Sequence, residues 1–226
     1  TGSVSEKKML ASVHAPMQHR KFCLEDEAVE FFDCTVGELL EEMAREYPDR
    51  EALVYSDRDL KYTYRQLNAR VDRVAKGMLA MGIGKGDHVG IWATNVPDWL
   101  TVFYASARIG AILVTVNTSY RPSELEYVIQ QSDMKALFLI DGYRETDYVQ
   151  TVYDLVPELK TMPKGSLQSA RFPFLKRVVY IGTRQHRGMY SFNDVMDLAD
   201  QIDPDAFVQV KASLDPHDTV NMQYTS

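Results

Sequence analysis

The sequence predicts an α/β protein in which a doubly wound, mostly parallel sheet carries helices on both faces. Short runs that are apolar throughout alternate along the chain with segments of helical periodicity. Such runs are typical of strands buried on both faces, and repeated strand–helix–strand units of this length join parallel strands. Ser, Thr, Asn or Asp residues precede several of the helical segments, which places N-caps at their starts.

The first predicted element is a capped helix. The segment before it shows no sustained period, and we assign residues 1–34 to an N-terminal extension and residues 35–226 to the folded domain. Thr35 and Glu38 form a capping box, in which each side chain bonds the backbone of the other residue. Apolar residues follow at helical spacing until Pro48, which cannot continue the helix.

A hairpin and a longer helix come next. Apolar runs at 52–55 and 60–63 flank a short polar turn, which is typical of two antiparallel strands. Thr63 opens the longer helix through a second capping box, and Gly82 ends it. The run Gly82-Ile83-Gly84-Lys85-Gly86 has the composition of a nucleotide-binding loop, but it follows a helix and opens a strand. We therefore interpret it as a helix C-cap and turn.

From residue 88 onward the alternation that predicts the sheet is regular. Each short apolar run predicts a strand, and each capped segment of helical period predicts a helix. We expect Asn95 and Ser191 to be N-caps in this part of the chain. The expected strands lie at 88–93, 112–116, 136–140, 178–181 and 219–224, and the expected helices lie at 97–109, 122–131, 146–156 and after Ser191.

Composition and charge argue against several classes of protein. The 226 residues are 45% apolar and carry a formal net charge of -7, which disfavours a nucleic-acid surface. Cys23 and Cys34 fit neither a zinc site nor a disulfide framework, and they indicate reduced thiols in a cytosolic protein. The apolar stretch at 99–116 contains Arg108, so it does not predict a membrane span. Acidic residues near the start argue against a targeting peptide, and we expect a cytoplasmic protein.

Polar residues follow the predicted strands at their carboxyl ends. Ligands bind beyond these ends in open α/β sheets. The same residue types are also the usual helix caps and turn formers, so for any single one both interpretations stay open. For Asp141 we expect a cap of the next helix. The strand ends are Thr94-Asn95, Asn117-Thr118-Ser119, Asp141-Gly142, Gly182-Thr183 and Thr225-Ser226.

Neither the histidines nor the basic residues form a catalytic motif. None of the five histidines belongs to a metal-ligand pair, so we predict no metal site. The Gly-x-Ser-x-Gly motif of a serine nucleophile does not occur either. Between Leu159 and Asn193 there are seven Lys or Arg residues and no Asp or Glu. A solvated face is the usual interpretation of such a run, and a patch that contacts phosphate groups is the alternative.

Five blocks of the sequence occur in the order found in one enzyme family. The blocks are 35–54, 62–68, 82–98, 110–127 and 222–226. Together they resemble the adenylate-forming (AMP-binding) family, and within it the acyl-CoA synthetases. The chain is most similar to the medium-chain fatty acyl-CoA synthetases, and the resemblance implies that its sheet is part of their large N-terminal domain.

The resemblance implies an ATP-dependent acid–thiol ligase that acts on a fatty acid or another carboxylate. Such an enzyme joins the carboxylate to AMP with release of pyrophosphate, and coenzyme A then displaces AMP to form a thioester. The implied cofactors and co-substrates are ATP, Mg²⁺ and coenzyme A. A homodimer is a possible assembly, and neither nucleic acid nor a membrane span is implied. The alternative is a non-catalytic α/β binding or scaffold module.

The resemblance also implies roles for particular residues. Thr225 and Ser226 stand where the phosphate-binding loop of the family begins, so we expect them to contact the phosphates of ATP. The catalytic lysine, the acyl pocket and the rest of that loop lie downstream in the family, so we expect no catalytic residue here and no activity of these residues alone. For Arg144 a plain surface role is the alternative. The implied coenzyme A contacts are Asn117, Thr118, Ser119 and Arg144.

Overall fold

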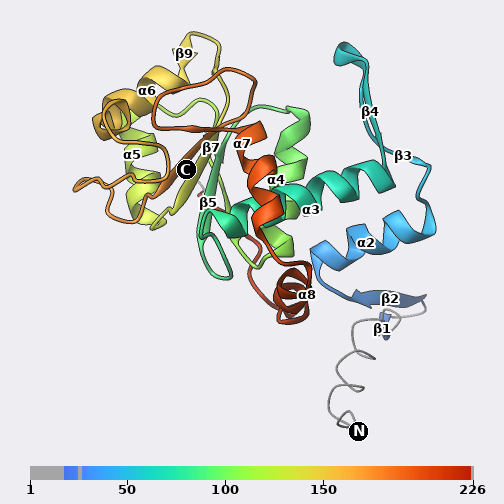
Figure 1. Ribbon diagram of the computed structural model, residues 1–226. Coiled ribbons are helices and arrows are strands. Elements are labelled where there is room, and N and C mark those ends of the chain that lie inside the picture. Colours follow the sequence, from blue (N-terminus) through green and yellow to red (C-terminus); the bar gives the residue numbers. More distant parts are fainter. Residues whose placement is uncertain (1–17, 25–26, 225–226) are drawn as a thin grey trace, which may run out of the picture.

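A computed structural model describes the backbone of residues 18–24 and 27–224 and the side chains from Asp33 to Tyr224. Its centre is a six-stranded sheet with the order β11-β10-β7-β5-β6-β12 (Figure 1), and every neighbouring pair in it is parallel. The predicted parallel sheet is therefore confirmed. The strands are β5 (His88–Trp92), β6 (Ile112–Thr115), β7 (Ala136–Leu139), β10 (Arg177–Tyr180), β11 (Tyr190–Ser191) and β12 (Asn221–Gln223).

Helices cover both faces of this sheet, as the apolar runs predicted. In β7, Ala136 and Phe138 pack into the core on one face, and Leu137 and Leu139 pack into the core on the other. Residues from α2 (Val36–Glu46), α3 (Tyr64–Ala80), α4 (Pro97–Arg108), α7 (Phe192–Leu198) and α8 (Pro204–Ala212) contribute to the first core. The second core is covered by α5 (Pro122–Gln131) and α6 (Tyr148–Leu155).

The chain reverses direction beside β5. From β5 it passes through α4 to β6, and from β6 it returns through α5, on the opposite face, to β7 on the far side of β5. Such a reversal opens a crevice at the carboxyl ends of the strands, where ligands bind in sheets of this kind. A small hairpin of β8 (Gly142–Tyr143) and β9 (Thr146–Asp147) lies beyond this edge, at the top of Figure 1.

Three of the predicted helix caps are confirmed, and those assigned to Asn95 and Asp141 are wrong. The start of α4 has Val96 as N-cap without a side-chain hydrogen bond, so Asn95 does not cap it. Pro97 is the first residue of α4, and its fixed φ and missing N–H favour a helix start without a side-chain cap. The confirmed caps, each accepting the N–H three residues further on, are Thr35, Thr63 and Ser191.

The glycine run between α3 and β5 is a turn, as predicted. Gly82 and Gly86 have φ values of 80° and 82°, in the left-handed region that glycine enters without a steric penalty. The N–H of Gly86 donates to the carbonyl oxygen of Gly110 at 2.8 Å. The run thus closes the helix and directs the chain into β5.

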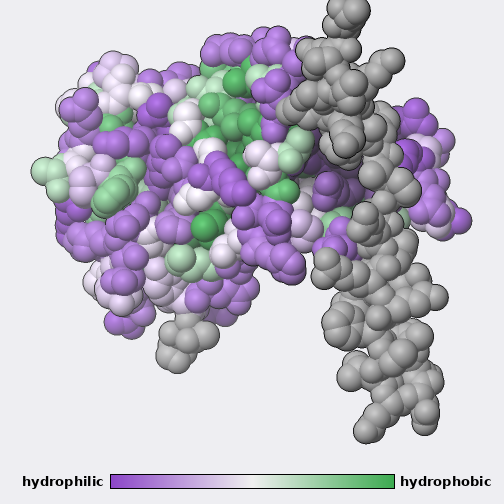
Figure 2. Space-filling view, turned by 90° about the horizontal axis from the view of Figure 1, so that it is seen from below, coloured by the Kyte–Doolittle hydropathy of each residue, from purple (hydrophilic) through white to green (hydrophobic). Residues whose placement is uncertain are grey.

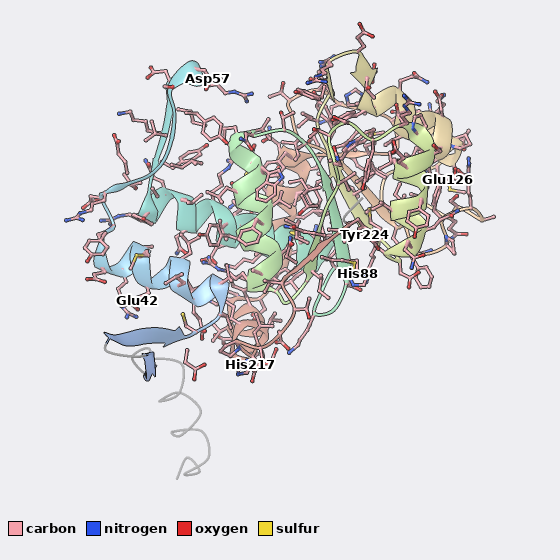
Figure 3. All side chains as sticks on the ribbon, turned by 180° about the vertical axis from the view of Figure 1, so that it is seen from behind. Glu42, Asp57, His88, Glu126, His217 and Tyr224 are labelled. Atoms are coloured by element: carbon pink, nitrogen blue, oxygen red, sulfur yellow. The ribbon has the colours of Figure 1, made fainter. Side chains whose placement is uncertain are left out.

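Several elements were not predicted from the sequence, among them the β8–β9 hairpin. The segment assigned to the N-terminal extension contains an antiparallel hairpin of β1 (Gln18–Leu24) and β2 (Glu27–Asp33). The helix α8 begins at Pro204, where the Asp203 side chain accepts two backbone N–H groups. The predicted hairpin of β3 (Glu51–Tyr55) and β4 (Leu60–Thr63) is confirmed. Its tip, marked by Asp57 in Figure 3, extends away from the sheet and its helices.

Polar side chains predominate on one face of the molecule (Figure 2). Figure 2 shows one face, on which hydrophilic side chains surround a smaller apolar area. No helix among the described residues is long and apolar enough to span a membrane. Among the residues with described side chains, the large apolar ones that are exposed are Leu39, Val54, Tyr127, Phe174 and Val208.

A buried arginine joins the first three long helices. Arg108 of α4 is 1% exposed, and its guanidinium donates to the Gly37 carbonyl oxygen at 3.1 Å and to Asn68 Oδ1 at 2.8 Å. It also pairs with Asp72 at 2.7 Å and with Glu41 at 3.6 Å. A buried charge requires such partners, so Arg108 fixes α2 and α3 against α4.

Candidate functional site

Two adjoining hollows lie at the carboxyl edge of β5, β6 and β7. Both are open to solvent, and they share Thr118 and Tyr143. The first, of about 560 Å³, is lined by Ala93, Thr94, Asn95, Trp99, Thr115, Val116, Asn117, Thr118 and Tyr143. The second, of about 330 Å³, is lined by Thr118, Ser119, Tyr143, Arg144, Glu145 and Thr146. The structure therefore brings together the four residues that the sequence analysis linked to coenzyme A.

The loop after β6 forms a tight turn that points polar groups outward. Asn117 Oδ1 accepts the N–H of Ser119 at 2.9 Å, and the Asn117 carbonyl oxygen accepts the N–H of Tyr120 at 3.1 Å. The hydroxyl groups of Thr118 and Ser119 make no hydrogen bond within the described part of the chain. These hydroxyls are therefore available to a ligand in the second hollow.

Arg144 stands at the tip of the β8–β9 hairpin. Its φ of 53° lies in the left-handed region, which costs a residue with a side chain on the order of 1 kcal/mol. The guanidinium carbon lies 5.1 Å from the centre of the Tyr143 ring. Arg144 is exposed, and no carboxylate of the described residues pairs with it. Its charge is free to meet an anion in the second hollow.

Two buried aromatic residues, which were not predicted as functional from the sequence, hold the loop after β6. The rings of Trp92 and Tyr148 stack with their centres 3.6 Å apart and their planes at 8°. The indole N–H of Trp92 donates to the Asn117 carbonyl oxygen at 3.1 Å, and the Tyr148 hydroxyl donates to the Thr118 carbonyl oxygen at 2.6 Å. The one sequence signal that could have indicated this role is the position of Trp92 at the end of the apolar run that forms β5.

The Tyr148 hydroxyl remains a donor across the physiological pH range. Burial of the ring, and to a smaller extent the neighbouring Tyr143, raise the pKa of Tyr148 to about 12. Its ordinary pKa is about 10. The hydrogen bond to the Thr118 carbonyl therefore does not depend on pH near neutrality.

Asp141 does not cap the next helix, contrary to expectation. Its carboxylate pairs with Arg184 at 2.6 Å. Asp147 caps α6 instead, because its side chain accepts the N–H of Gln150 at 2.8 Å. The reason is the β8–β9 hairpin, which separates the end of β7 from the start of α6 and was not predicted.

The run of basic residues between 159 and 193 is largely neutralised by acids from other segments. The guanidinium of Arg177 donates to carbonyl oxygens rather than to a carboxylate. This arrangement fits a solvated face and not a phosphate-binding patch. The ion pairs are Lys160 with Asp154, Lys164 with Asp194, Arg171 with Glu126, and Arg184 with Asp141.

The predicted phosphate-loop residues, Thr225 and Ser226, lie outside the described residues. The strand expected to lead to them is confirmed as β12, and it lies parallel to β6 with Gln223 opposite Thr115. No group of three His, Cys, Asp or Glu side chains that could hold a metal ion occurs among the residues with described side chains. These residues alone therefore provide no set of ligands for Mg²⁺.

The fold and its edge hollows define an open, doubly wound α/β protein with polar groups gathered at the carboxyl edge. Comparison with protein families gives a match to the family described as AMP-binding enzyme over residues 40–226. Because the match covers most of the chain, the chain belongs to this family. The predicted resemblance is confirmed.

Similar proteins are acyl-CoA ligases by name. "Putative acyl-CoA synthetase YngI" of Bacillus subtilis is 48% identical over 197 residues, which cover 87% of this chain and 36% of the relative. Human "Medium-chain acyl-CoA ligase ACSF2, mitochondrial" is 34% identical over 209 residues, covering 85% and 31%. The chain thus spans about a third of the length of these relatives.

A solved structure supports the fold independently. The N-terminal domain of FACL13 from Mycobacterium tuberculosis superposes with a TM-score of 0.61 at 20% identity, covering 85% of this chain and 42% of that one. At this identity the similarity concerns the fold alone. It confirms that a sheet with helices on both faces is the architecture of this chain.

Proposed function

We propose that this chain is the front part of the large domain of an ATP-dependent fatty acid–CoA ligase. Membership of the AMP-binding family across residues 40–226, together with relatives named as acyl-CoA ligases, is the observation that carries the proposal. On this proposal residues 35–226 belong to the large domain, residues 1–34 precede it, and the protein works in the cytoplasm in fatty acid metabolism.

The proposed reaction has two steps. A carboxylate oxygen attacks the α-phosphorus of ATP, which forms acyl-AMP and releases pyrophosphate. The thiolate of coenzyme A then attacks the acyl carbon, and AMP leaves with the electrons of the broken C–O bond. Both steps move negative charge onto phosphate oxygens, and preorganised N–H and hydroxyl donors stabilise such charge without reorganising. Mg²⁺ would offset charge on the ATP phosphates.

The carboxyl edge supports a role in binding coenzyme A. Thr118 and Ser119 present free hydroxyls, and Arg144 presents an unpaired guanidinium beside the same hollow. Hydroxyls and a guanidinium are suitable partners for a phosphate or for the polar pantetheine chain. We propose that these groups, with Asn117, contact coenzyme A, and that Thr225 and Ser226 contact the ATP phosphates.

The coenzyme A assignment is tested in the longer protein that we propose carries this chain. Arg144→Ala should raise the KM for coenzyme A about 10-fold, because a charged hydrogen bond is lost, and should leave fatty-acid-dependent pyrophosphate exchange unchanged. Arg58→Ala is a matched control, because Arg58 is also an exposed arginine in a hairpin turn but lies between β3 and β4. An unchanged KM for coenzyme A in Arg144→Ala would disprove the assignment.

The phosphate assignment has its own test. Ser226→Ala should slow pyrophosphate exchange on the order of 10²-fold if its hydroxyl contacts phosphate mainly in the transition state. Residues 1–226 alone should release no pyrophosphate with fatty acid, ATP and Mg²⁺. Sequencing the gene beyond codon 226 should reveal Gly-Thr-Thr-Gly. A stop codon there, with no activity in the native protein, would instead favour a non-catalytic binding or scaffold module.

A further inference from the structure

We propose that Trp92 and Tyr148 are positioning residues that hold the loop at 117–119 in the shape that receives coenzyme A. This inference rests on the proposed function, since it assigns a task to two residues behind the same hollow. Both side chains are fully buried. They contact the backbone of the loop rather than the hollow, so they would act on a ligand only through the loop.

The loop has few other fixed contacts. Asn117 and Ser119 are exposed, and within the described part of the chain the turn itself is closed by the short-range bonds from the N–H groups of Ser119 and Tyr120 to Asn117. Short-range bonds set the local turn but do not anchor it to the sheet. The bonds from Trp92 and Tyr148 span 25 and 30 residues of sequence. They are the anchors that fix two successive carbonyl groups, and hence the directions of the side chains between them.

The ring stack makes the two anchors one unit. Trp92 ends β5, and Tyr148 opens α6. With their planes at 8° and their centres 3.6 Å apart, each ring restricts the other, so both polar atoms face adjacent carbonyl groups. An apolar core position requires only a ring of suitable size. Packing alone does not require that an N–H and an O–H point at consecutive carbonyl groups, whereas a positioning role does.

The same unit connects the two segments that form the second hollow. Thr118 and Ser119 come from the loop after β6, and Arg144 comes from the β8–β9 hairpin. Tyr148 follows Arg144 by four residues, and its N–H donates to the Asp141 carbonyl oxygen at 2.9 Å, which closes the base of the hairpin. Tyr148 therefore sets the loop with its hydroxyl and the hairpin with its backbone. Its loss should misplace the loop relative to Arg144.

Tyr148→Phe tests the inference because it keeps the ring and removes one hydrogen bond. In the complete enzyme we expect the KM for coenzyme A to rise about 3- to 10-fold, as for a lost neutral hydrogen bond, with kcat and the KM for ATP nearly unchanged. The amide protons of Ser119 and Tyr120 should also exchange faster with solvent. Trp92→Phe should have the same effects, and it provides a second route if either variant folds poorly.

A matched control lies on the same helix. The Tyr153 hydroxyl donates to the Arg187 carbonyl oxygen at 2.9 Å, so Tyr153→Phe also removes one tyrosine–carbonyl bond, but away from the hollow. It should leave the KM for coenzyme A and the exchange of the Ser119 amide unchanged. Equal KM values for Tyr148→Phe and Tyr153→Phe, with Arg144→Ala still impaired, would overturn the positioning role alone. If Arg144→Ala has a normal KM for coenzyme A, the proposed function of the hollow fails first.

Discussion

Replacing Arg108 with methionine should destabilise the fold by about 3 kcal/mol. The arginine is 1% exposed and makes hydrogen bonds to the Gly37 carbonyl and the Asn68 side chain, in addition to its ion pairs with Asp72 and Glu41. Methionine fills much of the same volume, so the main loss is polar. The Gly37 carbonyl and the Asn68 side chain would each lose the hydrogen bond that Arg108 donates.

The magnitude follows from how exposed the partners are. Removing one member of a buried ion pair costs about 3–5 kcal/mol when the other charge is left buried. Here the side chains of Asp72 and Glu41 are 33% and 32% exposed, so water recovers part of their loss. We therefore place the effect at the low end, about 3 kcal/mol, which corresponds to a fall in Tm of about 6–12 °C for a chain of this size.

Urea unfolding followed by circular dichroism measures this difference. Arg73→Met is the control, because Arg73 is 45% exposed and pairs with a 75% exposed Asp200 at 3.2 Å. Exposed pairs contribute little, so the control should lose less than about 0.5 kcal/mol. If Arg108→Met loses no more free energy of unfolding than Arg73→Met, the buried ion cluster does not stabilise the packing of α2 and α3 on α4.

Three further predictions follow from the packing and the charges. Gly77→Ala should lower the Tm by several degrees because its methyl group would collide with the Val195 backbone. Gly84→Ala should leave the Tm unchanged because the space around Gly84 is open. Equal Tm values for the two variants would contradict the predicted collision. Burial raises the pKa of Asp194, but hydrogen bonds from Lys164 and from Ser191 lower it more, so its net pKa is below the ordinary value. The carboxylate therefore stabilises the fold above its unfolded pKa near about 4, and this stabilisation is lost as the pH falls through the folded pKa. Thermal melts of Asp194→Asn should show a smaller acid-induced loss of Tm than melts of the unchanged protein. An unchanged pH profile would refute the link between this pKa and stability. Hydrogen exchange should be faster in the half-exposed β3–β4 hairpin than in β5, and equal protection would show that the hairpin is more firmly packed than its burial indicates.

The local signals in the sequence predicted most of the fold correctly. The capping boxes at Thr35, Thr63 and Ser191 and the apolar run of β7 depend on residues close together in the chain. Such signals do not depend on tertiary contacts, so they can be recognised in the sequence without knowledge of the fold. The β8–β9 hairpin has only two residues in each strand, too short for any period, and for that reason the cap of α6 was assigned to Asp141 instead of Asp147.

The sequence by itself determined the order and type of the main elements, the family resemblance and the residues at the strand ends. Only the tertiary structure decided which of these residues share a site. Thr118 and Arg144 line one hollow because parallel strands bring their carboxyl ends to one edge, although the two residues are far apart in the chain. The contacts of Trp92 and Tyr148 with the loop after β6 were likewise set by packing across the sheet. An aromatic residue in a buried run gives no sign of the distant carbonyl group to which it donates, because that direction depends on the neighbouring strand and not on the adjacent sequence.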